Sequence, residues 1–358
     1  MIRIVMNKNV MSLCFCSLVG ISSLNYAAYT NPNLVATQPK FEISLGALYL
    51  QPSSSNLDYA VLGYPFPTES PHWNVQTVKP TYSLGFDLRG RYFIPDTNYD
   101  VAASWDHLNT SDSDFTQVGT GSGLFVVIPF QAGPSFGQSF NNPSQQATST
   151  VKFYYDVINL DIGKNIDFTP YTEMRFFVGL SGARLKQNIS TTFADNAHTF
   201  SINSTNNSKF TGIGPLIGAE GKYKFISTGL DLFGAVTGSA LVGSLDPSTN
   251  YTSSSPQLAG SGIGTNYQSI SPKTTTQGVP GVDAKLGLDY SHSISMGAIF
   301  TASLGYEYAT YFNAIATYNP SVVVGNINTG TIALNSLSKT TSNFTVQGPF
   351  INFGIAIL

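Results

Sequence analysis

Apolar and polar residues alternate strictly along several stretches of the chain. Every second residue from Tyr82 to Leu88 is apolar, and serine, glycine and aspartate stand between them. Because successive side chains of a strand point to opposite faces, this pattern predicts a strand with one apolar and one polar face. Segments with such alternation, which we expect to be strands, are 41–49, 82–88, 99–105, 153–162, 174–180, 213–225, 230–236, 282–290, 294–308 and 351–357.

One of these segments changes its pattern midway. Phe153, Tyr155 and Val157 share one parity, whereas Ile158 and the apolar residues after it share the other. A β-bulge inserts one extra residue into a strand and so moves the following side chains to the opposite face. The sequence therefore predicts a bulge near Val157.

The connections between the predicted strands alternate in length. Short turns are expected at 95–98, 165–170, 226–229 and 291–293, and long loops at 51–78, 109–149, 188–209, 244–277 and 311–343. Short turns on one side and long loops on the other are typical of bacterial outer-membrane barrels. We therefore predict an all-β fold, a transmembrane antiparallel up-and-down barrel of about ten strands, with eight to twelve as the range. Both termini are expected on the short-turn, periplasmic side.

The composition favours a membrane location. Charged residues make up 10% of the chain and aromatic residues 13%, against about 25% charged residues in soluble globular proteins. A lipid-facing belt needs no charge, so the shortage fits a barrel embedded in a bilayer. The formal net charge of −3 lacks the basic character of a nucleic-acid binder, so no nucleic-acid partner is expected. A soluble β-sandwich is the alternative fold, although its outer face would normally carry charges.

The first residues have the features of a secretory signal. A basic start precedes an apolar segment at 10–21, and Ala27 and Ala28 offer a cleavage site. Residues 1–28 are therefore predicted to be a cleaved signal peptide, and residues 29–358 the barrel. Both cysteines lie inside this signal, so no disulfide is expected in the mature chain. The expected location is the bacterial outer membrane, as an integral protein.

The polar positions of the alternating segments place many charges on the inner face of the predicted barrel. The residues expected to face the lumen are Asp87, Arg89, Arg91, Asp100, Asp156, Asp161, Glu173, Arg175, Glu220, Lys222, Lys224, Asp283, Lys285, Asp289 and Glu307. They could line a pore with charges of both signs, or they could form a salt-bridged plug. Eight strands leave room only for side chains, and open aqueous channels appear at about 16–18 strands, so the strand count leaves both readings open.

Several segments resemble the pore-forming major outer membrane protein family typified by Legionella. They are FEISLGALYLQP at 41–52, KPTYSLGF at 79–86, YDVINLDIG at 155–163, RFFVGL at 175–180, FTGIGP at 210–215 and LGLDY at 286–290. The resemblance covers nearly all of the mature chain. Its motifs mark barrel strands and carry no chemistry. What the family implies is passive diffusion of small solutes and contact with host surfaces.

One pair of residues bears on an enzymatic function. Asp106 and His107 stand at the outer end of a predicted strand, and ten-stranded outer-membrane proteases use aspartate and histidine at that rim. Neighbouring residues of a strand face opposite ways, so these two cannot both face the lumen without a bulge. The four histidines have no metal-ligand spacing. We expect no catalytic, metal or cofactor site.

The sequence thus predicts a porin or channel for passive diffusion of small solutes or ions. The alternative is a surface adhesin or structural barrel whose extracellular loops bind host or partner molecules. The expected partners are outer-membrane lipid and small solutes or ions. Homo-oligomer formation and contact with a host surface are further partnerships that the sequence leaves open.

The predicted signal peptide can be tested by sequencing the N-terminus of the protein recovered from outer membranes. We expect the mature chain to begin near Ala28 or Tyr29, because the apolar segment and small residues before that point direct export and cleavage. Recovery of Met1 from a soluble fraction would contradict both the cleavage and the location.

Overall fold

The structure is a computed structural model, and it describes residues 40–63, 74–119, 125–127, 145–198, 201–225, 229–254, 266–295, 297–326 and 331–357. The predicted signal peptide, residues 1–28, lies outside these ranges. The described residues form strands and turns, and they contain no helix long and apolar enough to cross a membrane.

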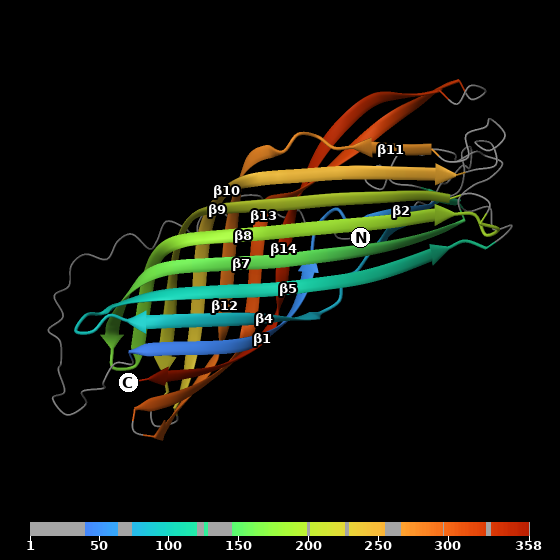
Figure 1. Cartoon of the computed structure of the whole chain (residues 1–358). Helices are drawn as coiled ribbons and strands as arrows, with labels where there is room; N and C mark the ends of the chain where they lie inside the picture. The colour runs from blue at the N-terminus through green and yellow to red at the C-terminus, as the bar shows by residue number, and fades with distance from the viewer. Residues whose placement is uncertain are drawn as a thin grey trace, which may run out of the picture. The chain divides into compact units, whose positions relative to one another are not determined.

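Ten strands in the described part of the chain close into one antiparallel ring (Figure 1). They are β1 (Phe41–Ser53), β4 (Ser83–Phe93), β5 (Tyr99–Gln117), β7 (Gln146–Thr169), β8 (Thr172–Ala194), β9 (Ser201–Lys224), β10 (Leu230–Ser254), β12 (Thr275–Ser295), β13 (Ala298–Asn326) and β14 (Thr331–Ile357). Each strand pairs with its neighbour in the ring, and pairing of β1 with β14 closes it. β11 (Asn266–Ile270) pairs with residues 249–253 of β10, along the same edge of β10 that pairs with β12 at residues 230–245. The predicted barrel is confirmed.

Closure explains how the chain can cross a membrane. Every strand of the ring has a partner on both sides, so its backbone N–H and C=O groups bond within the protein and none must be left unsatisfied in lipid. Phe41 at the start of β1 lies opposite Ile357 at the end of β14. Both ends of the barrel therefore lie on one rim, together with the short turns. Gly229 and Gly297 in those turns have φ of 68° and 97°, which glycine adopts without a Cβ clash.

An apolar belt covers the outside of the barrel next to that rim. Its side chains include Leu84, Ile217 and Leu286, which are 73%, 65% and 62% exposed. Rings follow its edges, with Tyr92, Tyr99, Tyr223 and Tyr290 toward the short turns and Tyr49, Trp105, Tyr306 and Tyr308 farther along the strands. Such girdles favour the two interfaces of a bilayer. The belt is therefore the lipid-facing surface.

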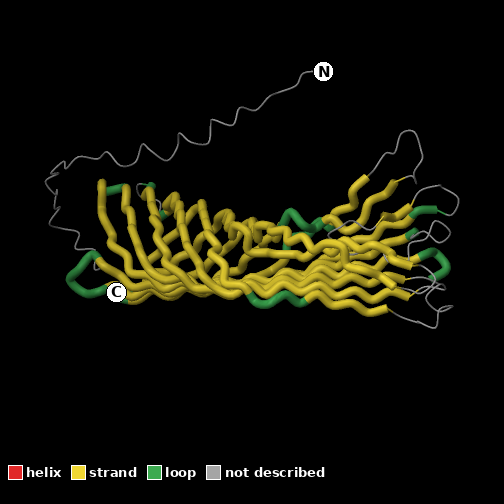
Figure 2. Tube along the Cα trace, turned by 90° about the horizontal axis from the view of Figure 1, so that it is seen from above, coloured by secondary structure: helices red, strands yellow, loops and turns green. Residues whose placement is uncertain are grey.

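The strands continue well beyond the belt, and here the expected loops were wrong. Segments 188–209 and 311–343 were predicted to be loops, but β8 and β9 extend through most of the first and β13 and β14 through most of the second. Figure 2 shows the strands running on toward the end of the barrel opposite the chain's C-terminus. Polar side chains pair across these extensions, as Thr192 Oγ1 does with Asn203 Oδ1 at 2.7 Å. Such pairs stabilise a sheet without an apolar outer face.

A small second sheet forms in two of the expected loops. It consists of β2 (Asp58–Gly63), β3 (Asn74–Thr77) and β6 (Phe125–Val127). Just before β2, Asn56 Nδ2 donates to Gln187 Oε1 of β8 at 2.7 Å and to Thr317 Oγ1 of β13 at 3.3 Å. These partners lie on different walls of the barrel. The segment that leads into the small sheet therefore crosses the lumen.

The polarity of the two faces inverts partway along the strands. On β8 the belt residues Phe176 and Val178 point outward and Arg175 points inward. Farther along, Leu185 and Phe193 are fully buried inside the barrel, whereas the residues that alternate with this face, such as Lys186 and Thr192, point outward. Lipid surrounds the lower half of the barrel, which is the half next to the short turns, and water surrounds the upper half. The apolar side chains therefore point outward in the lower half and inward in the upper half.

This inversion corrects the interpretation of β7. Its pairing with β5 and β8 keeps one register from Gln146 to Asp167, so no bulge occurs at Val157. Phe153, Tyr155 and Val157 point inward, and Ile158 points outward, with no change of parity. The apolar residues switch faces because the surroundings change, and the backbone stays regular.

The inward apolar residues of the upper half pack into one core. Its largest fully buried side chains are Tyr59, Phe153, Tyr155, Phe193, Phe210 and Phe344, none more than 1% exposed. The Phe153 and Phe344 rings meet edge to face with centroids 5.6 Å apart, and Tyr155 stacks on Phe344 at 6.1 Å. We call this core the apolar layer. It lies in the extracellular half of the lumen, where buried polar side chains such as Asn56 and Gln187 accompany it.

The lipid-facing belt can be tested with one arginine at two positions. Leu286→Arg places a charge in the belt, whereas Asn109→Arg places it on the outer face beyond the belt. An arginine near the bilayer midplane costs about 2–4 kcal/mol and one near or beyond the interface about 0–1 kcal/mol. Reversible unfolding from lipid vesicles should therefore show a large loss of stability for Leu286→Arg only. Equal losses would mean that the belt is misplaced.

Candidate functional site

The periplasmic half of the lumen is lined by charged side chains from most of the strands. Alternation of side chains along each strand explains why these residues share the inner face. The structure places on this face Asp87, Arg89, Arg91, Asp100, Asp161, Glu173, Arg175, Glu220, Lys222, Lys224, Asp283, Lys285, Asp289 and Glu307. We call them, with the further members named below, the charged layer.

Arg175 of β8 holds one end of the charged layer together. It is only 3% exposed, and its guanidinium Nε donates to Asp100 Oδ1 of β5 at 2.9 Å. It also forms ion pairs with Asp161 of β7 and, at 3.8 Å, with Glu220 of β9. A planar fork with five donors can serve several carboxylates at once. Arg175 thus links four strands by charge-assisted bonds.

Glu220 connects this cluster to the opposite wall. Its Oε2 accepts from Arg91 Nη2 of β4 at 2.6 Å, and its Oε1 lies 4.0 Å from Arg89 Nη1. Arg89 in turn approaches Asp87 at 3.8 Å. β4 and β9 do not pair in the ring, so these contacts span the lumen.

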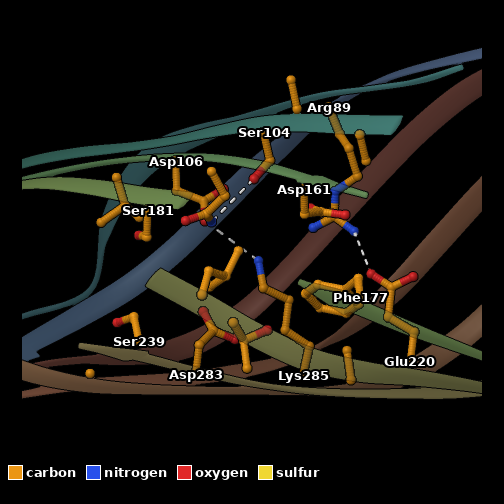
Figure 3. Close-up of a pocket in the computed structure, with 18 of the residues that line it drawn as sticks. Arg89, Ser104, Asp106, Asp161, Phe177, Ser181, Glu220, Ser239, Asp283 and Lys285 are labelled. Atoms are coloured by element: carbon orange, nitrogen blue, oxygen red, sulfur yellow. Dashed lines mark hydrogen bonds and ion pairs between the residues drawn. The ribbon is translucent and has the colours of Figure 1, made fainter. Parts of the chain in front are cut away.

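Lys285 of β12 is the centre of a second cluster. Its ammonium lies 3.0 Å from Glu307 Oε2 and 3.7 Å from Asp106 Oδ2, and Figure 3 shows it directed toward Asp106. One oxygen each of Asp106, Asp283 and Glu307 lies within 4.8 Å of the others. Three carboxylates this close could hold a metal ion, but the Lys285 ammonium already supplies positive charge among them.

Two further ion pairs lie nearer the short turns. Lys222 Nζ donates to Asp289 Oδ2 at 2.7 Å, and Lys224 Nζ lies 3.1 Å from Glu173 Oε2. These pairs are more exposed than the clusters around Arg175 and Lys285. The charged layer therefore runs from a buried interior toward the periplasmic rim.

Two small cavities lie within the charged layer. They measure about 60 and 90 Å³, and both are lined by Arg89, Arg91, Glu220 and Lys285. The first also touches Tyr311, which belongs to the apolar layer. Polar spaces of this size hold a few water molecules. The lumen thus contains polar cavities in its lower half and ends at packed apolar side chains above.

Asp156 is the one predicted lumen residue that the structure places elsewhere. It lies on the outer face of β7, where its Oδ1 is 2.6 Å from His107 Nδ1 of β5. The sequence predicts it in the lumen only if β7 has a bulge at Val157, and β7 has none. Asp106 and His107 face opposite sides of β5, as their adjacency predicted.

Sequence reasoning missed three members of the charged layer. Asp106 is 3% exposed and faces the lumen, and Glu42 and Asp231 also lie on the inner face. All three could have been found from the sequence, because each stands an even number of residues from another inward-facing residue on its strand. Asp106 shares the parity of Asp100 on β5, although in the sequence it stands out only as the neighbour of His107.

Comparison with a protein-family model shows to which family the chain belongs. The model described as Legionella pneumophila major outer membrane protein precursor matches residues 32–357. The chain belongs to this family. Like the rest of the family, this member is an integral outer-membrane protein, and its belt contacts membrane lipid. A search of curated proteins finds no match.

Solved structures similar to this family member are outer-membrane proteins. The outer membrane protease OmpT of Escherichia coli is 11% identical, with 91% of this chain and 99% of that chain covered and a TM-score of 0.42. The translocator domain of the autotransporter NalP of Neisseria meningitidis is 12% identical, with 91% and 90% covered and a TM-score of 0.31. A deltaS2S3 mutant of the Pseudomonas putida channel TodX is 10% identical, with 89% and 91% covered and a TM-score of 0.29. Scores this low carry no argument about function.

The role of Arg175 can be tested by removing its side chain. Arg175→Ala should lower the free energy of unfolding by about 3–5 kcal/mol, because it leaves buried carboxylates without a partner. Lys164→Ala, on the outer face of β7, should change it little. Denaturant unfolding in lipid vesicles measures both. If the two variants unfold at the same denaturant concentration, Arg175 does not hold the charged layer together.

Proposed function

We propose that this protein is a narrow outer-membrane channel for small ions or solutes, closed at rest by the apolar layer. The observation that carries the proposal is the charged layer within the bilayer span. Replacing a buried ion network by packed apolar residues is often neutral or stabilising. The upper half of this same lumen is packed mainly with apolar side chains, together with uncharged polar ones such as Asn56 and Gln187. Charges retained in the lower half therefore favour a role in passage over a role in packing.

The charges of this layer favour cations. Carboxylates outnumber ammonium and guanidinium groups on the inner face. The carboxylates are Glu42, Asp87, Asp100, Asp106, Asp161, Glu173, Glu220, Asp231, Asp283, Asp289 and Glu307, and the cations are Arg89, Arg91, Arg175, Lys222, Lys224 and Lys285. Rings of acidic side chains attract cations in narrow pores. We therefore infer a preference for cations over anions.

Passage requires that the apolar layer move. Hydrophobic constrictions stop ions by excluding water, and a small displacement can wet them. Leu57 and Tyr59 of this layer belong to the segment around β2, which extends from a long connection and is not part of the ring. A segment outside the ring can shift without breaking a barrel strand. We propose that it acts as the gate.

A second function is supported by a different observation. The apolar layer is continuous and fully buried, which suits a structural barrel whose lumen never opens. The strand extensions present rows of serine, threonine and asparagine to the exterior. Such a barrel would act through these extensions as an adhesin toward host or partner molecules. Neither proposal involves enzymatic chemistry.

Planar-bilayer recordings separate the two functions. The wild type should show small, brief openings with a reversal potential that indicates cation preference. Phe344→Ala should lengthen the openings, because Phe344 packs on both Phe153 and Tyr155 in the apolar layer. Arg89→Ala should raise conductance and cation preference, more so at low salt, because it removes a positive charge that lines both cavities.

Asn109→Ala, on the outer face of β5, is the control and should behave as the wild type does. Failure of the wild type, Phe344→Ala and Arg89→Ala to conduct, with all three folded, would favour the structural barrel. Large, long-lived wild-type openings would show that the apolar layer is not a gate.

A further inference from the structure

Four cations gather on the outer face of the barrel just beyond the apolar belt. They are Lys152 on β7, Arg184 and Lys186 on β8, and Lys209 on β9. The residues directly before and after Lys152 are buried in the barrel, as are those beside Lys186. The four side chains therefore point away from the lumen, and we call them the basic patch.

The register of the strands brings these cations together. Lys186 lies directly opposite Lys209 across β8 and β9, and Arg184 stands two residues from Lys186 on the same face. Lys152 lies opposite Asn188, two residues beyond Lys186. Side chains directly opposite have Cβ atoms about 4.5–5.5 Å apart, and like charges in such positions destabilise a sheet. The basic patch therefore needs a counter-charge.

Two carboxylates of the protein stand opposite this patch, but neither forms an ion pair with it. Asp156 lies opposite Arg184 but is bonded to His107, and Asp246 lies opposite Lys209 without an ion pair. Across the ranges that the structure describes, none of the four cations forms an ion pair with a carboxylate. The cations of the charged layer, by contrast, all have carboxylate partners.

The patch lies at a defined depth. The outward residues one row closer to the short turns are Trp105, Ile158, Gly182, Ile213 and Val242 on five successive strands, and none of them is polar except for the Trp105 ring nitrogen. Two residues farther from the short turns, the outward position of β8 is Arg184. Two residues farther again, the outward positions of β8 and β9 are Lys186 and Lys209. The patch thus begins where the lipid belt ends, on the side away from the periplasmic rim.

We propose that the basic patch binds the phosphate groups of the phosphorylated glycolipid in the outer leaflet of the bacterial outer membrane. The phosphates of this lipid are carried on sugars directly above its acyl chains. Acyl chains over Ile158 and Ile213 would therefore bring phosphate beside Lys186, Lys209 and Arg184. Guanidinium forks match phosphate oxygens in pairs, and lysines add point charges.

Neighbouring groups suit the rest of such a lipid. The Lys186 ammonium lies 5.1 Å from the centroid of the Tyr154 ring, and tyrosine favours the interface between acyl chains and head groups. Farther from the belt, the amides of Asn188 and Asn207 bond to each other at 2.6 Å on the same face. Amides there can accept and donate hydrogen bonds to sugar hydroxyls. This proposal does not depend on whether the lumen conducts.

The test is a titration of the folded barrel in neutral detergent with bisphosphorylated lipid A, followed by native mass spectrometry. The variant is Lys186→Gln together with Lys209→Gln. The matched control is Lys164→Gln, because Lys164 also lies on the outer face over a tyrosine ring, Tyr99 at 5.6 Å, but at the periplasmic end. We expect the double variant to bind about tenfold more weakly or worse, and the control to bind as the wild type does.

Two further arms identify what is bound. Lipid A from which the phosphates have been removed should lose most of its affinity for the wild type, and inorganic pyrophosphate should not displace intact lipid A at equal concentration. Restoring charge with Lys186→Arg and Lys209→Arg should restore binding, which separates charge from folding defects. Unchanged binding by the glutamine variant, equal binding without phosphates, or ready displacement by pyrophosphate would each overturn the proposal.

Discussion

The structure depends on a single constraint: each strand that passes beyond the belt has lipid on its outer face at one end and water at the other. A barrel must keep its outer face apolar in lipid and polar in water. The long strands of this barrel meet both demands without a break, so apolar side chains that face outward in the belt face inward above it. The charged layer, the apolar layer and the basic patch all follow from that inversion.

The inversion divides the lumen into two parts with different energetics. Below, ion pairs of Arg175 with Asp100, of Arg91 with Glu220 and of Lys285 with Asp106 join strands that do not pair with each other. Above, aromatic rings and the segment around β2 exclude water. Charges are stable inside only where partners and polar cavities surround them, so the change from charged to apolar packing sets where a path through the barrel could close.

The same inversion decides what the outer face offers to its surroundings. At the belt edge the surface changes within one pair of residues from isoleucine to arginine and lysine. Cations held next to one another without partners favour anions of the surrounding leaflet over any group of the chain. Inside the barrel, by contrast, the cations are neutralised by the protein's own carboxylates, which leaves the lumen acidic on balance.

The sequence by itself determined the barrel, its belt and most of the charged layer, because alternation with a period of two is a local property of each strand. It could not determine which face is which once both faces had mixed polarity. The alternation at Phe153 and Tyr155 therefore predicts a bulge that does not exist, and with it an inward position for Asp156. For the same reason the polar extensions of β8 and β13 look like loops in the sequence. Only the tertiary structure decided these points, because the solvent outside a strand and the partners across the lumen are fixed by the closed ring and not by the residue's neighbours in the chain.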